Sequence, residues 1–332
     1  MGLAFGIGCL TKDPPNQFTK FVKNIEDWGF DTIWISDQDL FRDCYVSLAL
    51  AALNTTKIRL GTAVTNPITR HPAITTEAIG TIDELSGGRA ILGIAIGGSI
   101  LKGLELKSSV SICRESIFLI RRLLAGEKLS YTGRHFNLRD MKLDFETRAD
   151  IPIYVAASGP IMLRVAGEIA DGVISSTGVS HENLRFMFKN IREGTEKVDK
   201  KMQDFHSVCW TATSISENVE EAREDVKDFV AWAIANTPIL GKVSGIDEEN
   251  IHELREAYFL GGGRFGASGT KKFVTDEMVD KFAVAGTIED CVRKIRVIAR
   301  EGVNEFAFLP RGKNWEQTVR TFAEQVMPAF RD

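Results

Sequence analysis

The sequence lacks several features that would assign a protein to a class at once. Its five cysteines, at positions 9, 44, 113, 209 and 291, are widely spaced and contain no Cys-x-x-Cys pair. The five histidines contain no His-x-x-x-His pair, so we expect no metal site. This cysteine usage is typical of reduced thiols in a cytoplasmic protein.

Long apolar runs and an excess of basic residues are also missing. No run approaches the roughly 20 apolar residues of a membrane helix, so we expect no membrane partner. The net charge of −4 predicts no nucleic-acid partner. The first residues, MGLAFGIGCLTKD, lack the basic start of a secretory signal, so we expect none.

The sequence does contain a regular alternation of short apolar runs and amphipathic stretches. Several of the apolar runs are continuous, which is typical of parallel strands covered on both faces. The predicted strands are residues 3–8, 31–36, 57–64, 89–96, 152–157, 172–176, 206–213 and 304–309. The predicted helices are residues 16–28, 43–53, 73–85, 109–125, 160–169, 181–200, 217–236, 287–301 and 315–330, with 245–282 helical around a glycine-rich interruption.

Eight strand–helix units predict an α/β fold, a (β/α)8 TIM barrel with insertions. We expect one domain over residues 1–332, with insertions near 126–150 and 240–283. The alternative is an open doubly wound sheet. That fold would have a glycine-rich fingerprint after its first strand, and GIGCLT at residues 6–11 has only the first two glycines.

Polar residues follow the predicted strand ends, where active sites lie in this barrel. The segment IRLGTAVTNPITRHPA, residues 58–73, begins as a buried strand and turns polar at Thr65 and Asn66. Asp37 follows the second strand, where it is a helix cap, a solvated loop residue or a ligand contact. No nucleophile is paired with a base, since Ser158 lies in AASGP rather than in G-x-S-x-G. Such a pocket suits a ligand that brings its own chemistry.

Two glycine-containing segments are candidate anion sites. In AASGP, residues 156–160, a strand ends and a helix begins at Pro160, so free N–H groups and the helix dipole favour an anion. The other interpretation is an ordinary strand-to-helix turn. GGGRFGASGTKK, residues 261–272, is either a lid that attracts an anionic tail through Arg264, Lys271 and Lys272 or a solvated loop.

Longer motifs carry a resemblance to a known family. They are FGIG (5–8), WISD (34–37), LGTAVTNPITRHPAITTEAIGTIDELSGGRAILGI (60–94), AASGPIMLRVAGEIADG (156–172) and VTDEMVDKFAVAGTIEDCVRKI (274–295). In this order they resemble the bacterial luciferase-like superfamily, and within it the 5,10-methylenetetrahydromethanopterin reductases that use coenzyme F420, an 8-hydroxy-5-deazaflavin. The resemblance covers nearly the whole chain.

The resemblance implies a hydride transfer between the deazaflavin C5 and a substrate carbon, as in archaeal-type one-carbon metabolism. It also implies a non-prolyl cis peptide at Ala63-Val64 behind the deazaflavin ring. Family members are commonly oligomers, so a homo-oligomer acting on a small-molecule substrate, a tetrahydromethanopterin-type pterin, is implied. The implied cofactor-binding residues are Asp37, Ala63, Val64, Thr65, Asn66, Gly97, Gly98, Ala156, Ala157, Ser158, Gly159, Pro160, Ser175 and Ser176.

The chain departs from the family pattern on the side expected to hold the pterin. Gly8 replaces the glutamate proposed as the catalytic acid, Gln38 replaces a histidine, and Gly98 stands where the family has a more polar motif. The proton donor is therefore open. Candidate catalytic residues are Asp37, Asp39 and His71, with Glu77 and Glu105 as further acids nearby. An FMN-dependent monooxygenase and a catalytically silent flavin- or deazaflavin-binding protein are the alternative functions.

Overall fold

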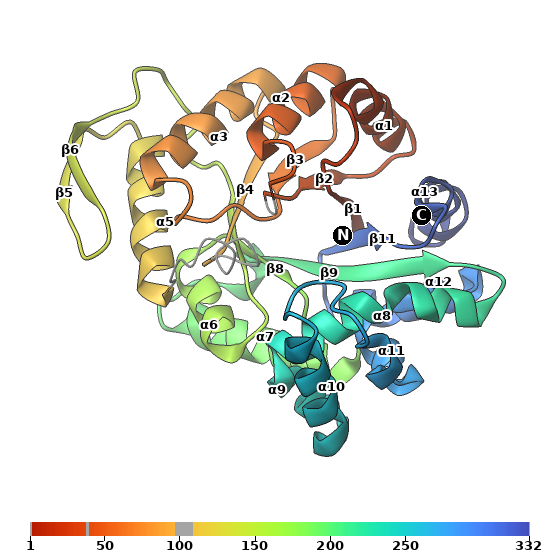
Figure 1. Cartoon of the computed structure of the whole chain (residues 1–332). Helices are drawn as coiled ribbons and strands as arrows, with labels where there is room; N and C mark the ends of the chain where they lie inside the picture. The colour runs from red at the N-terminus through yellow and green to blue at the C-terminus, as the bar shows by residue number, and fades with distance from the viewer. Residues whose placement is uncertain (1, 38–39, 97–108, 332) are drawn as a thin grey trace. The chain divides into compact units, whose positions relative to one another are not determined.

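Short apolar strands alternate with helices along the chain, as the sequence predicts (Figure 1). The computed structural model describes residues 2–37, 40–96 and 109–331. The strands are β1 (Ala4–Cys9), β2 (Thr32–Ile35), β3 (Arg59–Thr62), β4 (Ala90–Ile94), β5 (Leu129–Thr132), β6 (Asn137–Met141), β7 (Ile153–Ala156), β8 (Gly172–Ser175), β9 (His206–Ile215), β10 (Val284–Gly286) and β11 (Glu305–Pro310). The α-helices are α1 (Pro15–Asp27), α2 (Cys44–Asn54), α3 (Pro72–Ser86), α5 (Val110–Leu124), α6 (Pro160–Ile169), α7 (His181–Glu196), α8 (Val219–Asn236), α9 (Pro238–Val243), α10 (Glu248–Leu260), α11 (Asp276–Phe282), α12 (Ile288–Arg300) and α13 (Trp315–Thr321).

The main sheet has the strand order expected of a barrel. Nine strands pair in the order β10-β9-β11-β1-β2-β3-β4-β7-β8, and a further pairing of β9 with β8 closes the sheet. The predicted (β/α)8 TIM barrel is therefore confirmed. No helix among the described residues is both long and apolar enough to cross a membrane.

Four elements escaped the sequence prediction, and two predicted helices are too long. Strands β5 and β6 form a separate antiparallel hairpin inside the stretch 126–150. The three-residue strand β10 pairs with β9, and the short helix α9 precedes α10. The helix predicted over 181–200 ends at Glu196. The helix predicted over 315–330 continues beyond Thr321 as a π turn and then a 3₁₀ turn.

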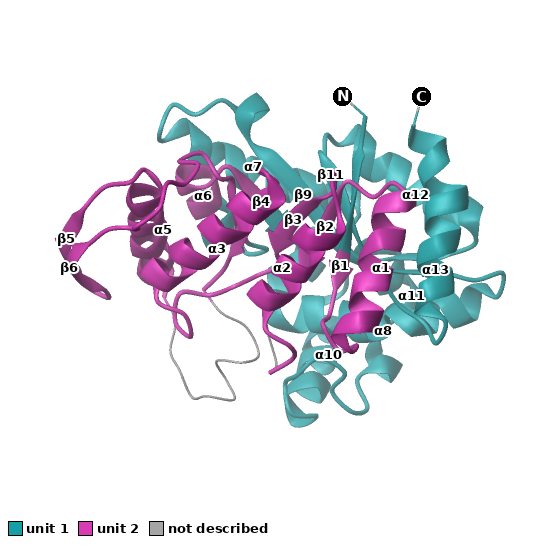
Figure 2. Cartoon of the chain, turned by 90° about the horizontal axis from the view of Figure 1, so that it is seen from above, with its two compact units in different colours: residues 1–7, 157–164, 174–332 teal, residues 8–156, 165–173 magenta. Residues whose placement is uncertain are grey.

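The chain divides into two compact units (Figure 2). Unit 1 comprises residues 1–7, 157–164 and 174–332, and unit 2 comprises residues 8–156 and 165–173. In unit 2, β2, β3 and β4 pair in parallel, and Trp34 of β2 is fully buried. A Cβ atom on Gly61 of β3 would lie 2.3 Å from the Trp34 ring, so only glycine fits there.

In unit 1, aromatic stacking orients β11. The rings of Phe306 and Phe308 stack on Phe322, which follows α13, with centroid separations of 5.9 and 4.4 Å. Because side chains alternate along a strand, Leu309 and Arg311 point to the opposite face. Leu309 accordingly packs into a second cluster, formed largely by α8 and its neighbouring helices.

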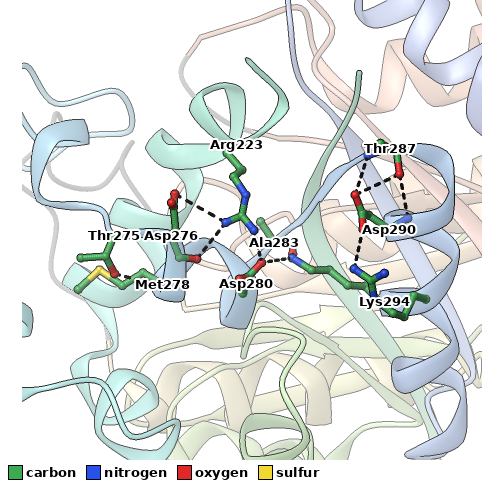
Figure 3. A network of polar contacts seen from close by, with 10 residues as sticks. Arg223, Thr275, Asp276, Met278, Asp280, Ala283, Thr287, Asp290 and Lys294 are labelled. Carbon is green, nitrogen blue, oxygen red and sulfur yellow. Dashed lines mark hydrogen bonds and ion pairs between the residues drawn. The ribbon is translucent and has the colours of Figure 1, made fainter. Parts of the chain in front are cut away.

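Ion pairs hold three helices of unit 1 together (Figure 3). Arg223 of α8 donates to Asp280 of α11 at 2.9 Å, and Lys294 of α12 reaches the same carboxylate at 2.8 Å. Thr287 and Asp290 form a capping box at the start of α12. The network thus links α8 to α11 and α12, the helices that precede and follow β10 in the chain.

In unit 2, one carboxylate caps the chain just before β3. Glu26 Oε1 accepts hydrogen bonds from the backbone N–H groups of Thr56, Lys57 and Ile58 at 2.9, 2.7 and 2.9 Å. Desolvation by itself would raise the pKa of Glu26. The three backbone donors, led by that of Ile58, outweigh it and lower this pKa.

We expect Glu26→Gln to lower the free energy of unfolding at neutral pH and to have little effect in acid. A carboxyl group whose folded pKa is depressed adds stability above its unfolded pKa of about 4.3, and this stability is lost as the pH falls through the folded pKa. Urea unfolding of the wild type and the variant between pH 7 and pH 3 measures the difference. Glu84→Gln, on the exposed surface of α3, is the control. A wild-type advantage that persists at the acid end would contradict the assignment.

Candidate active site at the strand ends

The chain leaves the sheet and rejoins it where β3 ends. Thr62 closes β3 with its hydroxyl bonded to the Gly93 carbonyl at 2.7 Å, and the N–H of Thr65 returns to that same carbonyl at 3.0 Å. Between them the Ala63-Val64 peptide bond is cis, as predicted from the resemblance. Ala63 and Val64 are half-buried while their neighbours Thr62 and Thr65 are fully buried. The bulge therefore presents backbone and small side chains at the C-terminal end of the strand.

Asp37 and Thr65 meet at the ends of β2 and β3. The Thr65 hydroxyl donates a hydrogen bond to Asp37 Oδ2 at 2.7 Å. Asp37 Oδ1 has no hydrogen-bond partner among the described residues. Burial raises the pKa of Asp37, although the hydrogen bond from Thr65 and the charge of Arg70 partly offset this rise. A half-buried carboxyl group of this kind holds a proton more readily than an exposed one.

Arg70 and Tyr45 lie near Asp37 and Thr65, and the sequence analysis singled out neither of them. Arg70 Nη2 pairs with Asp43 Oδ2 at 2.9 Å, and its guanidinium lies 4.5 Å from the centre of the Tyr45 ring. Asp43 also caps α2 through the N–H groups of Tyr45 and Val46. The Tyr45 hydroxyl is buried without a hydrogen-bond partner among the described residues, and burial raises its pKa. The only sequence signal was the arginine inside TNPITRHP.

Two other predicted residues of unit 2 use their side chains to shape the turn. Asn66 Oδ1 accepts from the N–H groups of Ile68 and Thr69 at 3.1 and 2.9 Å, which is an Asx turn. His71 caps α3, with Nδ1 accepting from the Ala73 N–H at 3.2 Å, and its ring packs edge-on against Phe136. The His71 contacts are those of a helix cap.

In unit 1, the predicted anion site forms a tight strand-to-helix turn. The N–H of Ala157 bonds to the Ile174 carbonyl at 3.0 Å, and the Ser175 hydroxyl donates to the Ala157 carbonyl at 2.6 Å. Helix α6 then begins at Pro160. A Cβ atom on Gly159 would meet nothing closer than Thr237 Cγ2 at 4.0 Å, so a small side chain fits at this position.

For the remaining predicted site residues the structure shows little beyond their exposure. Ser158 and Ser176 are half-buried, and Ala156 is the last residue of β7. Glu77 is exposed on α3. Gln38, Asp39, Gly97, Gly98 and Glu105 lie outside the described residues. Across the ranges that the structure does describe, no three His, Cys, Asp or Glu side chains gather as a metal site would require.

Comparisons with known proteins identify the family of this chain. The 5,10-methylenetetrahydromethanopterin reductase of Archaeoglobus fulgidus is 33% identical over 336 residues, covering 99% of this chain and 100% of the relative. The F420-dependent glucose-6-phosphate dehydrogenase of Amycolatopsis mediterranei is 26% identical over 334 residues, covering 96% of this chain and 95% of the relative.

A solved structure extends the similarity to three dimensions. The coenzyme F420-dependent tetrahydromethanopterin reductase of Methanopyrus kandleri superposes with a TM-score of 0.89 at 30% identity, covering 100% of both chains. The profile of the luciferase-like monooxygenase family matches residues 4–305. The resemblance predicted from the sequence is confirmed, and the chain belongs to the luciferase-like monooxygenase family.

Proposed function

We propose that this protein is a coenzyme F420-dependent oxidoreductase that transfers a hydride between the deazaflavin C5 and a substrate carbon. The observation that carries the proposal is end-to-end similarity, at 33% identity, to a methylenetetrahydromethanopterin reductase. The coenzyme F420-dependent tetrahydromethanopterin reductase of Methanopyrus kandleri also shares the fold over the full length, with a TM-score of 0.89. Further relatives are named as F420-dependent dehydrogenases.

The residues present fit a deazaflavin with an anionic tail. The half-buried bulge at Ala63-Val64 offers a small, uncharged backing for a flat ring. The turn at Gly159 is not crowded, since a Cβ atom there would fit, and it leads into the first N–H groups of α6, which favour a negative charge. Thr177, two residues beyond Ser175, has a buried hydroxyl with no partner among the described residues, which a ligand oxygen would satisfy. We propose that these residues hold the cofactor, together with the other predicted contacts at 97–98, 156–158 and 175–176.

In this proposal the cofactor supplies the hydride chemistry, and the protein aligns the reactants and handles the proton. Asp37 Oδ1 is the proposed proton donor, because its carboxyl group is half-buried with a raised pKa and the oxygen is unpartnered within the described residues. Thr65 orients the carboxyl group through Oδ2. Gly8, at the position of the family's glutamate, lies buried in β1 and carries no side chain.

The proposed substrate is a tetrahydromethanopterin-type pterin or a relative of it. The similarity to the methylenetetrahydromethanopterin reductases supports this class. The replacements at positions 8, 38 and 98 indicate a substrate side that differs from that of the reductases. Methylenetetrahydromethanopterin is therefore the first substrate to assay, followed by other pterins.

Titration of the full chain with oxidised F420 and, separately, with FMN tests the cofactor. We expect F420 to bind tightly, seen as a change in its absorbance and fluorescence, and FMN to bind at least about tenfold more weakly. Tight binding of FMN alone would instead place the protein with the monooxygenases. If F420 binds but no donor and acceptor pair turns over, the protein is a silent deazaflavin-binding protein and the proposal fails.

The organisation of the chain completes the proposal. We propose one luciferase-like barrel domain over residues 1–332, with the hairpin β5–β6 and the segment from α9 to α11 as its insertions. We also propose a homo-oligomer in the cytoplasm. Light scattering of the purified protein tests the assembly, and a monomer at micromolar concentration would contradict it.

A further inference from the structure

A guanidinium with no counter-ion among the described residues lies where β11 ends. Arg311 follows Pro310 directly, and its backbone N–H donates to the Thr213 carbonyl of β9 at 2.9 Å. The alternation along β11 turns its side chain away from Phe308 and Phe322, to the face where Leu309 meets the α8 cluster. Arg311 is thus a cation at the C-terminal end of a barrel strand, the end at which active sites form.

The contacts of this side chain hold it in place without neutralising it. Phe265, in the glycine-rich loop, lies 5.0 Å from the guanidinium carbon. The Nη1 atom reaches only the adjacent Pro310 carbonyl at 3.4 Å, and the Nε atom is buried with no hydrogen-bond partner among the described residues. Within the described chain no carboxylate lies in ion-pair range of Arg311. Burial lowers the pKa of this guanidinium to about 10, although the charge of Asp228 acts in the opposite sense.

The neighbouring acids are already engaged. Asp228 of α8 pairs with Lys271 at 3.4 Å, and Lys271 also reaches Glu224. Asp225 accepts the Ser214 hydroxyl at 2.8 Å. Lys271, which the sequence offered as an attractor for an anionic tail, is therefore neutralised by α8, and Arg311 remains as the desolvated cation.

We propose that Arg311 binds an anionic group, a carboxylate or a phosphate, on the substrate. This inference rests on the proposed function and adds that the substrate is an anion. A half-buried guanidinium whose Nε–H has no partner among the described residues gains charge-assisted hydrogen bonds when an oxyanion binds to it. The Phe265 ring, whose centre lies 5.0 Å from the guanidinium carbon, adds a cation–π contact that favours the charged side chain at this place.

The inference predicts a specific effect of the acid next to it. The negative charge of Asp228 partly offsets the positive charge of Arg311 and repels an incoming anion. We therefore expect Asp228→Asn to strengthen anion binding. Because Asp228→Asn also frees Lys271, the gain is measured again in the double variant with Arg311→Met: it disappears there if Arg311 holds the anion and persists if Lys271 does. Arg264, exposed in the same loop, supplies the matched cation control.

The test measures the Tm of the full chain, saturated with oxidised F420, as sodium phosphate, sulfate or acetate replaces chloride at constant ionic strength. At least one of these anions is expected to raise the Tm of the wild type and of Arg264→Met. The apparent Kd should be about 10- to 100-fold weaker in Arg311→Met and severalfold tighter in Asp228→Asn. If Arg311→Met does not fold, Arg311→Lys, which keeps the charge and loses the planar fork, replaces it.

Three results would overturn the inference. They are no anion-dependent rise in the wild type, an equal rise in the Arg311 variant, and no gain in Asp228→Asn. A fourth concerns the cofactor tail: if Arg311→Met weakens F420 but not the deazaflavin lacking its phosphate tail, the anion belongs to the cofactor. If F420 does not bind at all, only the proposed function is contradicted. The same anion series measured without cofactor still tests Arg311.

Discussion

Asp37→Asn is expected to lower kcat about 100-fold or more in the F420-dependent reaction, the range that general acid catalysis supplies. Asparagine keeps the shape of the side chain and can still accept the Thr65 hydrogen bond, but it cannot release a proton. Because Asp37 is only one of the many proposed cofactor contacts and asparagine keeps its shape, the affinity for oxidised F420 should change by less than about tenfold. Steady-state kinetics with methylenetetrahydromethanopterin and an F420 titration separate the two effects.

The stability of this variant should move in the opposite direction to its activity. Burial raises the folded pKa of Asp37, so this group adds stability below its unfolded pKa of about 3.9 and loses that contribution as the pH rises through the folded value. At neutral pH a charged, desolvated carboxylate is a cost to the fold. The Tm of Asp37→Asn should therefore equal or exceed that of the wild type, whereas a merely structural Asp37 would give a lower Tm together with the lost activity.

The pH profile gives a second check on the same role. A general acid works in its protonated form, so the rate should fall as the pH rises through the pKa of Asp37. The Thr65 hydrogen bond lowers this pKa, so Thr65→Val should shift the falling limb to higher pH. Thr81→Val, on the exposed surface of α3, should leave the limb in place. An unshifted limb in Thr65→Val would show that another group donates the proton.

The elements that sequence could predict are those with a strong local signal. All eight predicted barrel strands are present, because continuous apolar runs such as RAILGIAI are readable without knowledge of their partners. The hairpin β5–β6 was missed because most of its residues face solvent and show no apolar alternation. The strand β10 has three residues, which is too short for any period to show.

In the candidate site, too, the features with a local sequence signal were predicted and those that depend on long-range packing were not. The bulge at Ala63-Val64 was predicted because a motif resembling a known family marks it. The environment of Asp37 was not readable, since Thr65 and Arg70 lie about 30 residues away in the chain and meet it only through the β2–β3 pairing. The same holds for Arg311, whose missing counter-ion can be recognised only once α8 and the glycine-rich loop are packed around it.

Gly159→Asp is expected to weaken F420 binding about 100-fold or more while leaving the fold intact. The nearest atom to a Cβ at this position is Thr237 Cγ2 at 4.0 Å, so the side chain has room. A carboxylate there would occupy the N-terminus of α6, bond to its free N–H groups and repel the phosphate of the cofactor tail. The loss of one charge-assisted anion site and the added repulsion each contribute about 1.5–3 kcal/mol, which together exceed a factor of 100.

The matched control is Gly159→Ala, which adds the same Cβ without charge and should change the Kd by less than about fivefold. A deazaflavin lacking the phosphate tail sharpens the test, because it should bind the wild type and Gly159→Asp with similar affinity. Equal losses in the alanine and aspartate variants would mean that shape rather than charge matters at this turn. Unchanged F420 binding in Gly159→Asp would remove the α6 N-terminus from the cofactor site and leave the anionic tail to be held elsewhere in the barrel.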